Sequence, residues 1–373
     1  MSGIYIHIPF CDQACHYCDF HFSTTFQKYR HKLLKTIQKE LFTKLSENVE
    51  KIETIYFGGG TPSVLCVEEL KEIMDVIQQT SDVSEDAEVT LEANPNHLTS
   101  DYLKGLKSIG VNRLSIGIQS FHDEVLEKLN RNHDSLQAKE VVQRAQKEGF
   151  DNITVDLIYG IPFQTDEQLE HNLVQISSLG IDHVSAYQLT IEENTVFGRW
   201  KDRGKLLELS DEKCLNQFKM VKSYLEKEGY EQYEVSNYAR NGKYSRHNSS
   251  YWKGVKYFGI GPGAHEFDGE KRSWNVSNNT LYIENNKVES EELSRVDSFN
   301  EKVLLGLRQL KVGIDREELK EEFPYLYQKI DKDLSDFISK GELIEKDSRV
   351  LVSEIGIFII DYITSELFII HED

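Results

Sequence analysis

The chain has 373 residues, of which 39% are hydrophobic and 28% are charged, a composition typical of a globular protein with one large domain and one smaller one. Lys and Arg total 43 against 63 Asp and Glu, and the net charge of -20 argues against a nucleic-acid partner, because phosphate binding depends on clustered cations. The start of the chain lacks the basic segment and apolar run of a signal peptide, and no stretch has the roughly 18 uninterrupted apolar residues of a membrane helix.

Strand-like and helix-like patterns alternate through the first half of the chain. The predicted strands are Gly3–Ile8, Ile52–Phe57, Ala87–Glu92, Arg113–Ile118, Asn152–Leu157 and His183–Gln188. The predicted helices are Lys28–Leu45, Glu68–Gln79, Ser100–Ile109, Ser135–Glu148 and Asp166–Leu179. This alternation predicts an α/β fold with a parallel sheet and crossover helices. Six units fit a partial (β/α)6 barrel better than a closed barrel of eight, and the pattern alone leaves an open sheet as the alternative.

Short segments rich in Pro or Gly follow four of these strands, at residues 8–10, 58–62, 92–95 and 160–162. In parallel β/α folds the carboxyl ends of the strands meet on one face, where ligands bind. Pro and Gly also simply mark turns, but their repetition at strand ends favours a binding face.

The alternation ends near residue 190. The polar segment Glu192–Lys205 indicates a linker, Ser210–Lys227 a helix, and the apolar spacing from Phe299 to Leu310 another helix. Leu343–Val352 predicts two short strands that turn at Asp347-Ser348, followed by a helix that ends at Phe368. We therefore expect a C-terminal α+β module of winged-helix type. The predicted division is a barrel at 1–190, a barrel extension at 191–297 and the module at 298–373.

Cysteine usage is uneven: the chain has five cysteines, and three of them are Cys11, Cys15 and Cys18. An even, dispersed set would indicate disulfides, whereas this cluster indicates metal ligation in a reducing compartment, so we expect a cytoplasmic protein. Thiolates hold iron–sulfur clusters, and three of them leave one iron of a [4Fe–4S] cubane open to a small molecule.

Zinc is the alternative occupant of this segment, since three cysteines and one histidine form a known zinc set. The histidines near enough to complete it are His7, His16 and His21. Structural zinc usually takes two closely spaced pairs of ligands, so the spacing favours the cluster. Cys66 and Cys214 stand alone and are expected to be small buried hydrophobes.

The spacing Cys11-x-x-x-Cys15-x-x-Cys18 is the signature of the radical S-adenosylmethionine superfamily. The surrounding residues, Tyr5-Ile-His-Ile-Pro-Phe-Cys11 and Tyr17-Cys-Asp-Phe20, resemble the family of oxygen-independent coproporphyrinogen III oxidases. Within it they are more similar to the heme-chaperone branch, the HemW type, and the resemblance covers almost the whole chain. It implies a cluster that passes one electron to bound S-adenosylmethionine, with the protein positioning the cofactor.

Several further segments match the same family in order. Gly58-Gly59-Gly60-Thr61-Pro62 is similar to its glycine motif for the methionine end of the cofactor, where backbone N–H groups can approach a carboxylate closely. The resemblance implies S-adenosylmethionine contacts from nine residues: Tyr5, Tyr17, Gly59, Gly60, Thr61, Glu92, Gln119, Arg131 and Asp156. Without it, these polar groups would be interpreted as strand-end caps or packing residues. No catalytic residue is assigned.

Two features separate the chain from the oxidases that it resembles. The oxidases carry another cysteine two residues after the third, where this chain has Phe20, and they have a longer segment before the signature. Both differences argue against coproporphyrinogen III oxidation, which remains the alternative function, and whether the chain is an enzyme stays open.

His247-Asn-Ser-Ser-Tyr251-Trp252 is similar to the His-Asn-x-x-Tyr-Trp motif of the chaperone branch, which is linked with heme. A neutral imidazole can ligate heme iron and aromatic rings can cover a porphyrin, so the resemblance implies heme binding at His247, with His265 as a second candidate. The other interpretation is a histidine that bonds locally in the core. The implied partners are heme or a porphyrin, a protein that reduces the cluster and a heme acceptor, and transient membrane association is left open.

Overall fold

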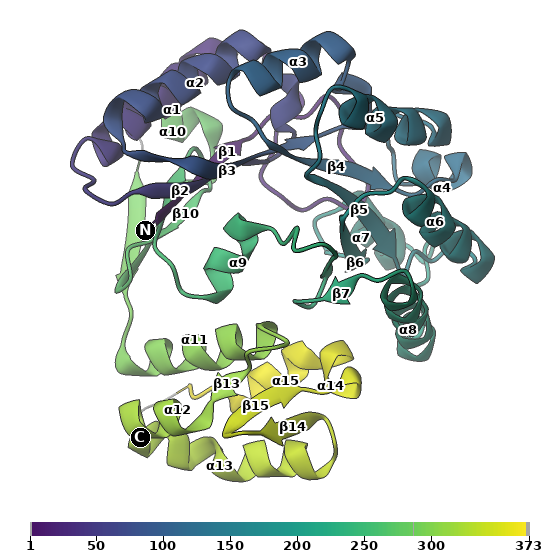
Figure 1. Cartoon of the computed structure of the whole chain (residues 1–373), viewed down its shortest axis with the longest axis vertical. Helices are drawn as coiled ribbons and strands as arrows, with labels where there is room; N and C mark the ends of the chain where they lie inside the picture. Colours follow the sequence, from purple (N-terminus) through teal and green to yellow (C-terminus); the bar gives the residue numbers. More distant parts are fainter. Residues whose placement is uncertain (1, 286, 371–373) are drawn as a thin grey trace.

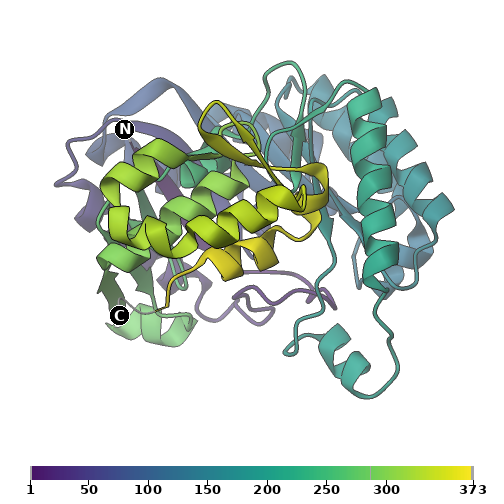
Figure 2. The same ribbon diagram turned by 90° about the horizontal axis from the view of Figure 1, so that it is seen from below.

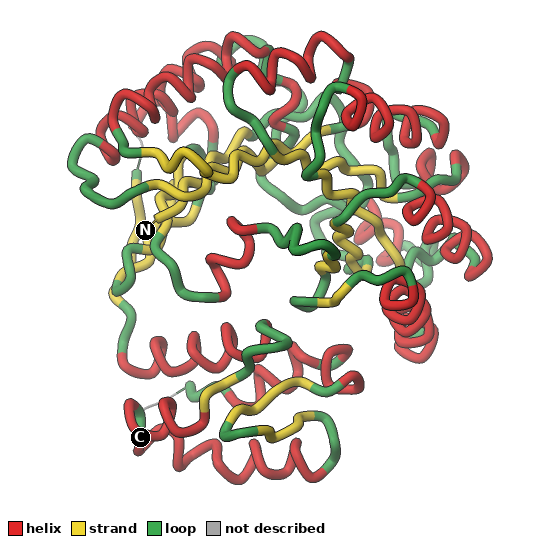
Figure 3. The backbone as a smooth tube through the Cα atoms, in the orientation of Figure 1, coloured by secondary structure: helices red, strands yellow, loops and turns green. Residues whose placement is uncertain are grey.

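A strongly curved sheet covered on its outer side by helices forms most of the molecule, with a smaller module beneath it (Figure 1). This computed structural model describes residues 2–285 and 287–370. Figure 3 shows the strands following one continuous arc, with the helices on its convex side. None of the helices in these ranges is long and apolar enough to cross a membrane.

Six parallel strands form the centre of the sheet, each paired with the next in chain order. They are β1 (Ser2–Ile8), β2 (Ile52–Gly59), β3 (Val83–Ala93), β4 (Arg113–Gln119), β5 (Ile153–Tyr159) and β6 (His183–Gln188). Their alternate residues, such as Ile4, Ile6 and Ile8, are fully buried between the sheet and the outer helices. The predicted partial barrel of six strands is therefore confirmed.

The outer helices follow the strands as the sequence predicts. They are α1 (Arg30–Leu45), α2 (Val67–Thr80), α3 (Ser100–Ser108), α4 (Asp123–Lys128), α5 (Ser135–Lys147), α6 (Asp166–Ser178) and α8 (Asp211–Lys227), with single 3-10 turns η1 (Pro62–Val64) and η2 (Pro95–His97). Thr99, Asp134 and Thr165 cap α3, α5 and α6 by accepting a backbone N–H three residues on. Only the short α4 was not predicted.

Further strands extend the sheet at both edges. On the β1 side lie β9 (Tyr257–Ile260), β10 (His265–Phe267), β11 (Lys271–Asn275) and β12 (Val288–Glu292), and on the β6 side lie β8 (Asn237–Ala239) and β7 (Glu231–Gln232). β9 runs parallel to β1, whereas the other added strands are antiparallel to their neighbours. The segment predicted as a barrel extension thus adds to the same sheet, and it also contains α10 (Asn279–Asn285).

The expected linker Glu192–Lys205 is wrong in its middle, where α7 (Val196–Asp202) forms. Thr195 caps this helix, and the side chain of Phe197, in its first turn, is fully buried. The polar composition of the segment predicted a linker, but one buried aromatic side chain and one capping residue are enough to stabilise a short helix here.

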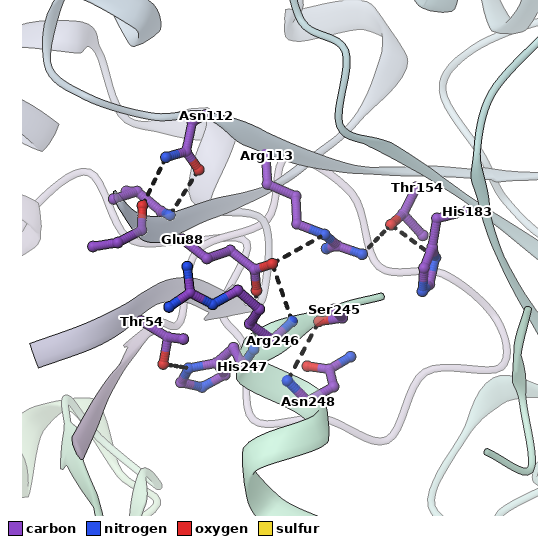
Figure 4. A network of polar contacts seen from close by, with 12 residues as sticks. Thr54, Glu88, Asn112, Arg113, Thr154, His183, Ser245, Arg246, His247 and Asn248 are labelled. Carbon is purple, nitrogen blue, oxygen red and sulfur yellow. Dashed lines mark hydrogen bonds and ion pairs between the residues drawn. The ribbon is translucent and has the colours of Figure 1, made fainter. Parts of the chain in front are cut away.

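Helix α9 (Arg246–Trp252) lies inside the curve of the sheet, between the barrel and the C-terminal module (Figure 1). Its N-terminus is held by Glu88 of β3, whose carboxylate accepts the backbone N–H groups of Arg246 and His247 at 3.0 and 2.9 Å. The buried guanidinium of Arg113 lies 3.9 Å from the same carboxylate and also contacts Thr154 (Figure 4). A buried charge at a helix N-terminus is favourable when it is paired in this way.

The C-terminal module contains α11 (Arg295–Arg308), β13 (Ile314–Asp315), α12 (Arg316–Glu322), α13 (Pro324–Ser339), β14 (Leu343–Lys346), β15 (Arg349–Val352), α14 (Glu354–Phe358) and α15 (Ile360–Leu367). Its three strands pair antiparallel in the order β13-β15-β14. The predicted hairpin is confirmed, and Asp347 and Ser348 both have positive φ, of 51° and 63°. The predicted final helix is instead two helices, because the backbone leaves helical geometry at Ile359.

The module meets the barrel through α11 and α9. Gln309, which follows α11, donates from its side-chain amide to the Trp252 carbonyl at 2.6 Å. Figure 2 shows the module from below, with the sheet behind it. The division of the chain at residues 190 and 297 stays a prediction.

We expect Glu88→Ala to lower the free energy of unfolding by about 3–5 kcal/mol, because it leaves Arg113 buried without its carboxylate. Urea denaturation in anaerobic buffer measures this loss. The exposed Glu85 on the same strand is the matched control, and Glu85→Ala should change stability by less than about 0.5 kcal/mol. Equal stabilities for the two variants would contradict the anchoring role of Glu88.

Candidate functional site

A cavity of about 460 Å³ opens at the carboxyl ends of the parallel strands. It gathers eleven of the thirteen residues proposed from sequence: Cys11, Cys15, Tyr17, Cys18, Gly59, Gly60, Thr61, Glu92, Gln119, Arg131 and Asp156. Tyr5 and His247 do not line it. These eleven residues span the first 156 positions of the chain, so the parallel topology alone explains why they meet.

The three clustered thiols share this cavity, and two of them accept hydrogen bonds. Thr61 Oγ1 donates to Cys11 Sγ at 3.3 Å, and Arg131 Nη1 donates to Cys15 Sγ at 3.2 Å. Burial raises the pKa of Cys11 to about 12 and that of Cys18 to about 11, so a bound cation must displace their protons.

The three thiols line one cavity, as the ligands of one [4Fe–4S] cluster must, and hydrogen-bond donors to ligand sulfurs are an ordinary part of iron–sulfur sites. In the described ranges, no set of three or more Cys, His, Asp or Glu side chains is placed to hold a single metal ion. The identity of the occupant stays a prediction.

The histidines of the zinc alternative all have hydrogen-bond partners elsewhere. His7 Nε2 bonds the His21 carbonyl at 2.8 Å, His21 Nε2 bonds Asn279 Oδ1 at 2.8 Å, and His16 Nδ1 bonds the Lys128 carbonyl at 2.9 Å. These bonds attach the cysteine segment to α10 and to the end of α4, so the histidines hold the loop in place.

The glycine motif is required by packing. Gly59 has a φ of 107°, and a Cβ there would lie 2.6 Å from the His7 ring, while a Cβ on Gly60 would lie 2.8 Å from the Phe10 carbonyl. The amides of Gly59, Gly60 and Thr61 already donate to Glu92 Oε2, the Ile8 carbonyl and the Phe10 carbonyl. All three amides therefore have partners within the protein, and the predicted contact of this loop with a ligand carboxylate stays a prediction.

Four acidic residues line the cavity, and two of them, Glu92 near the end of β3 and Asp156 within β5, have raised pKa values. Burial raises the pKa of Glu92 to about 7, against hydrogen bonds from Tyr56 and the Gly59 amide that lower it. Burial also raises the pKa of Asp156 to about 6, and Ser115 donates to it at 3.2 Å. Groups of this kind suit the cationic and hydroxyl parts of a small ligand.

Arg131 is the one cationic side chain among the described residues that line the cavity. Besides Cys15, it donates to Asn94 Oδ1 and to the Gly117 carbonyl, both at 2.6 Å. Asn94, which sequence reasoning did not assign, lies two residues after Glu92 at the end of the same strand and thereby orients Arg131. Gln119 holds a strained backbone, with a φ of 70°, at a bulge in β4.

Tyr17 lines the cavity and also packs against the apolar group that includes Ile161 and Phe197. The remaining predicted residues lie outside the cavity. Tyr5 lies beneath the cavity, with its hydroxyl 3.2 Å from His7 Nδ1. His265 is exposed on β10 and stacks on Trp274.

His247 is fully buried, and both of its ring nitrogens have partners. Nδ1 lies 2.7 Å from Thr54 Oγ1, and Nε2 lies 2.7 Å from the Tyr251 hydroxyl. Iron could bind this imidazole only after one of the two bonds breaks, so its assignment as a heme ligand stays a prediction.

Comparison with known proteins identifies several similar chains. The family model described as the radical SAM superfamily matches residues 5–175. The heme chaperone HemW of Bacillus subtilis is 36% identical, covering 95% of this chain and 96% of the relative, and that of Lactococcus lactis is 34% identical, covering 95% and 94%. The solved coproporphyrinogen III oxidase (HemN) of Escherichia coli, a radical SAM enzyme, has the same fold, with a TM-score of 0.83 at 21% identity over 98% of this chain and 90% of that one.

We expect Cys15→Ser to abolish the visible absorbance of a reconstituted cluster and to leave the fold largely intact, because it removes one of three thiolates. Iron, sulfide and zinc contents after anaerobic reconstitution measure the occupant. Cys66→Ser is the control, since Cys66 caps the start of α2 and is exposed, so the expectation that it is buried is wrong, whereas Cys214 is buried as expected. Tightly bound zinc in place of iron and sulfide would refute the cluster.

Proposed function

The chain belongs to the heme chaperone (HemW) family of the radical SAM superfamily, and from this membership we propose that it binds a [4Fe–4S] cluster, S-adenosylmethionine and heme, and delivers heme to an acceptor protein. The observation that carries the proposal is the gathering of three thiols, one arginine and the acidic groups of Glu92 and Asp156 around a single cavity. When bound, the reduced cluster supplies an electron to the sulfonium of the cofactor.

Different residues of the cavity suit different parts of the cofactor. Cys11, Cys15 and Cys18 would hold the cluster at the cavity that they line. Glu92, when ionised, attracts the amino group of S-adenosylmethionine, while Asp156 and Gln119 suit hydroxyl groups. Tyr17 and the loop Gly59–Thr61 form part of the cavity wall, and Arg131 stays next to the thiol of Cys15.

We propose that heme binds beside α9, in a cavity separate from the cofactor cavity. A second cavity, of about 610 Å³, lies between α9 and the start of the C-terminal module. Tyr233, Tyr244 and Trp252 supply aromatic rings to it. Three cations also line it, of which Lys253 is one, while Arg246 and Lys311 form ion pairs with glutamates of the same wall. Cavities of this size accept drug-sized ligands, aromatic rings suit a flat macrocycle, and cations suit carboxylates.

The partners proposed with this function are a reductant protein for the cluster and a heme acceptor. We propose a cytoplasmic location, because clustered thiols need a reducing compartment. No observation in the described ranges supports membrane association. Coproporphyrinogen III oxidation is the competing function, and Phe20, 69% exposed at the cavity, stands where the oxidases carry a further cysteine.

We expect the affinity for S-adenosylmethionine to fall as pH is lowered through about 7. Glu92 has a raised pKa of about 7 and attracts a cation only when ionised, so the attraction is present above that pH and lost below it. Equilibrium dialysis with the oxidised, reconstituted protein from pH 5.5 to 8.5 measures the profile. In Glu92→Gln the affinity should drop at least about tenfold at pH 8 and lose this dependence. A wild-type profile in that variant would exclude Glu92.

We expect the purified chain to bind heme and Trp252→Ala to weaken that binding about tenfold, through loss of ring contact. Soret absorbance during heme titration measures the affinity, and a melting curve measures stability. Trp274→Ala, on β11 and outside the second cavity, is the control.

His247→Ala separates a ligand from a structural histidine in the same assay. Loss of its buried hydrogen bonds should cost about 1–3 kcal/mol of stability. A changed Soret band would support ligation, whereas wild-type heme affinity with a lower melting temperature would assign His247 to the core.

A further inference from the structure

A single aromatic ring, that of Tyr56, connects His247 to the cofactor cavity. Its imidazole stacks on the Tyr56 ring with centroids 5.0 Å apart and planes at 23°. Thr54 on β2 and Tyr251 on α9 fix the imidazole from its two nitrogens, as described above, and Figure 4 shows it between Thr54 and the Glu88 anchor. The position of the imidazole is thus set by α9, and the position of Tyr56 is set in part by the imidazole.

Tyr56 in turn holds Glu92. Its hydroxyl donates to Glu92 Oε1 at 2.8 Å, while the Gly59 amide donates to Oε2 at 3.2 Å. Tyr56 is only 8% exposed, and Tyr5 stacks on it with centroids 6.1 Å apart. A ring confined by two stacked neighbours has few alternative rotamers, so its hydroxyl stays directed at the carboxylate.

We propose that His247 is a positioning residue for Glu92, acting through the stacked ring of Tyr56, so that the His-Asn-x-x-Tyr-Trp segment sets the affinity of the cavity for S-adenosylmethionine. The inference rests on the proposed function of Glu92 as the group that attracts the cofactor's amino group. It gives the motif a role that does not require His247 to touch heme.

The physical reason is the donor that Tyr56 supplies. A hydrogen bond to an ionised carboxylate favours that ionised form, so losing the bond raises the pKa of Glu92 beyond the effect of burial. The other titratable groups that interact with Glu92 are Tyr5 on β1, Asp156 on β5, Tyr187 on β6 and Tyr251 on α9. The tyrosines among them have pKa values raised by burial and stay neutral near pH 7, and Asp156 is present in every variant, so its charge acts on Glu92 in all of them.

The test compares the pH profile of S-adenosylmethionine binding in three variants of the reconstituted, full-length protein. Tyr56→Phe keeps the stack and removes the donor, and we expect the pH midpoint to rise by about one unit and the affinity at pH 7 to fall about fivefold. His247→Ala removes the imidazole from the stack, leaves Tyr5 against Tyr56, and should shift the midpoint in the same direction. Thr54→Val is the matched control, because it removes a hydrogen bond from His247 but leaves the imidazole between Tyr56 and Tyr251.

Stability alone does not produce this pattern. Thr54→Val should melt at a lower temperature with a wild-type pH midpoint, whereas His247→Ala should shift both. Wild-type midpoints in His247→Ala, alongside a shifted Tyr56→Phe, would overturn the inference and leave the proposed role of Glu92 intact. Wild-type binding in Glu92→Gln would instead remove the proposed role of Glu92, and the inference with it.

Discussion

Parallel pairing of six consecutive strands is the constraint on which the rest of this structure depends. Because every strand from β1 to β6 runs in the same direction, all six carboxyl ends lie at one edge of the sheet. Residues as distant in sequence as Cys11 and Asp156 therefore line one cavity. The same constraint leaves a polar barrel interior that must be filled, and α9 fills it from the C-terminal half of the chain.

Filling that interior requires that buried charges and hydroxyls have partners. Glu88 provides the key one, since it accepts two amides of α9 and faces Arg113. This anchor places His247 between Thr54 and Tyr251, and the imidazole then stacks on Tyr56, which bonds Glu92. A short series of contacts thus joins the packing of the barrel to the chemistry of the cofactor cavity. The two cavities lie on either side of this series of contacts.

Features that depend on local spacing were predictable from the sequence. The six strands, six of the seven outer helices and the hairpin at Asp347-Ser348 follow from periodicity and turn residues, and the thiol group follows from a spacing of seven residues. Features that depend on distant contacts were not. The bond between Thr54 and His247 joins residues 193 positions apart, and α7 depends on one buried phenylalanine in a polar segment. The glycine loop shows a third limit. Its sequence suggests backbone N–H groups that are open to a ligand, whereas in the structure these N–H groups donate to other residues of the protein.

The proposed function requires that the chain binds heme and leaves coproporphyrinogen III unoxidised. The most direct measurement incubates the reconstituted, reduced protein with S-adenosylmethionine and coproporphyrinogen III, beside a parallel heme titration. Stable heme binding with no loss of coproporphyrinogen III is the predicted result. Steady conversion of coproporphyrinogen III with no stable heme binding would contradict the claim and assign the chain to the oxidases.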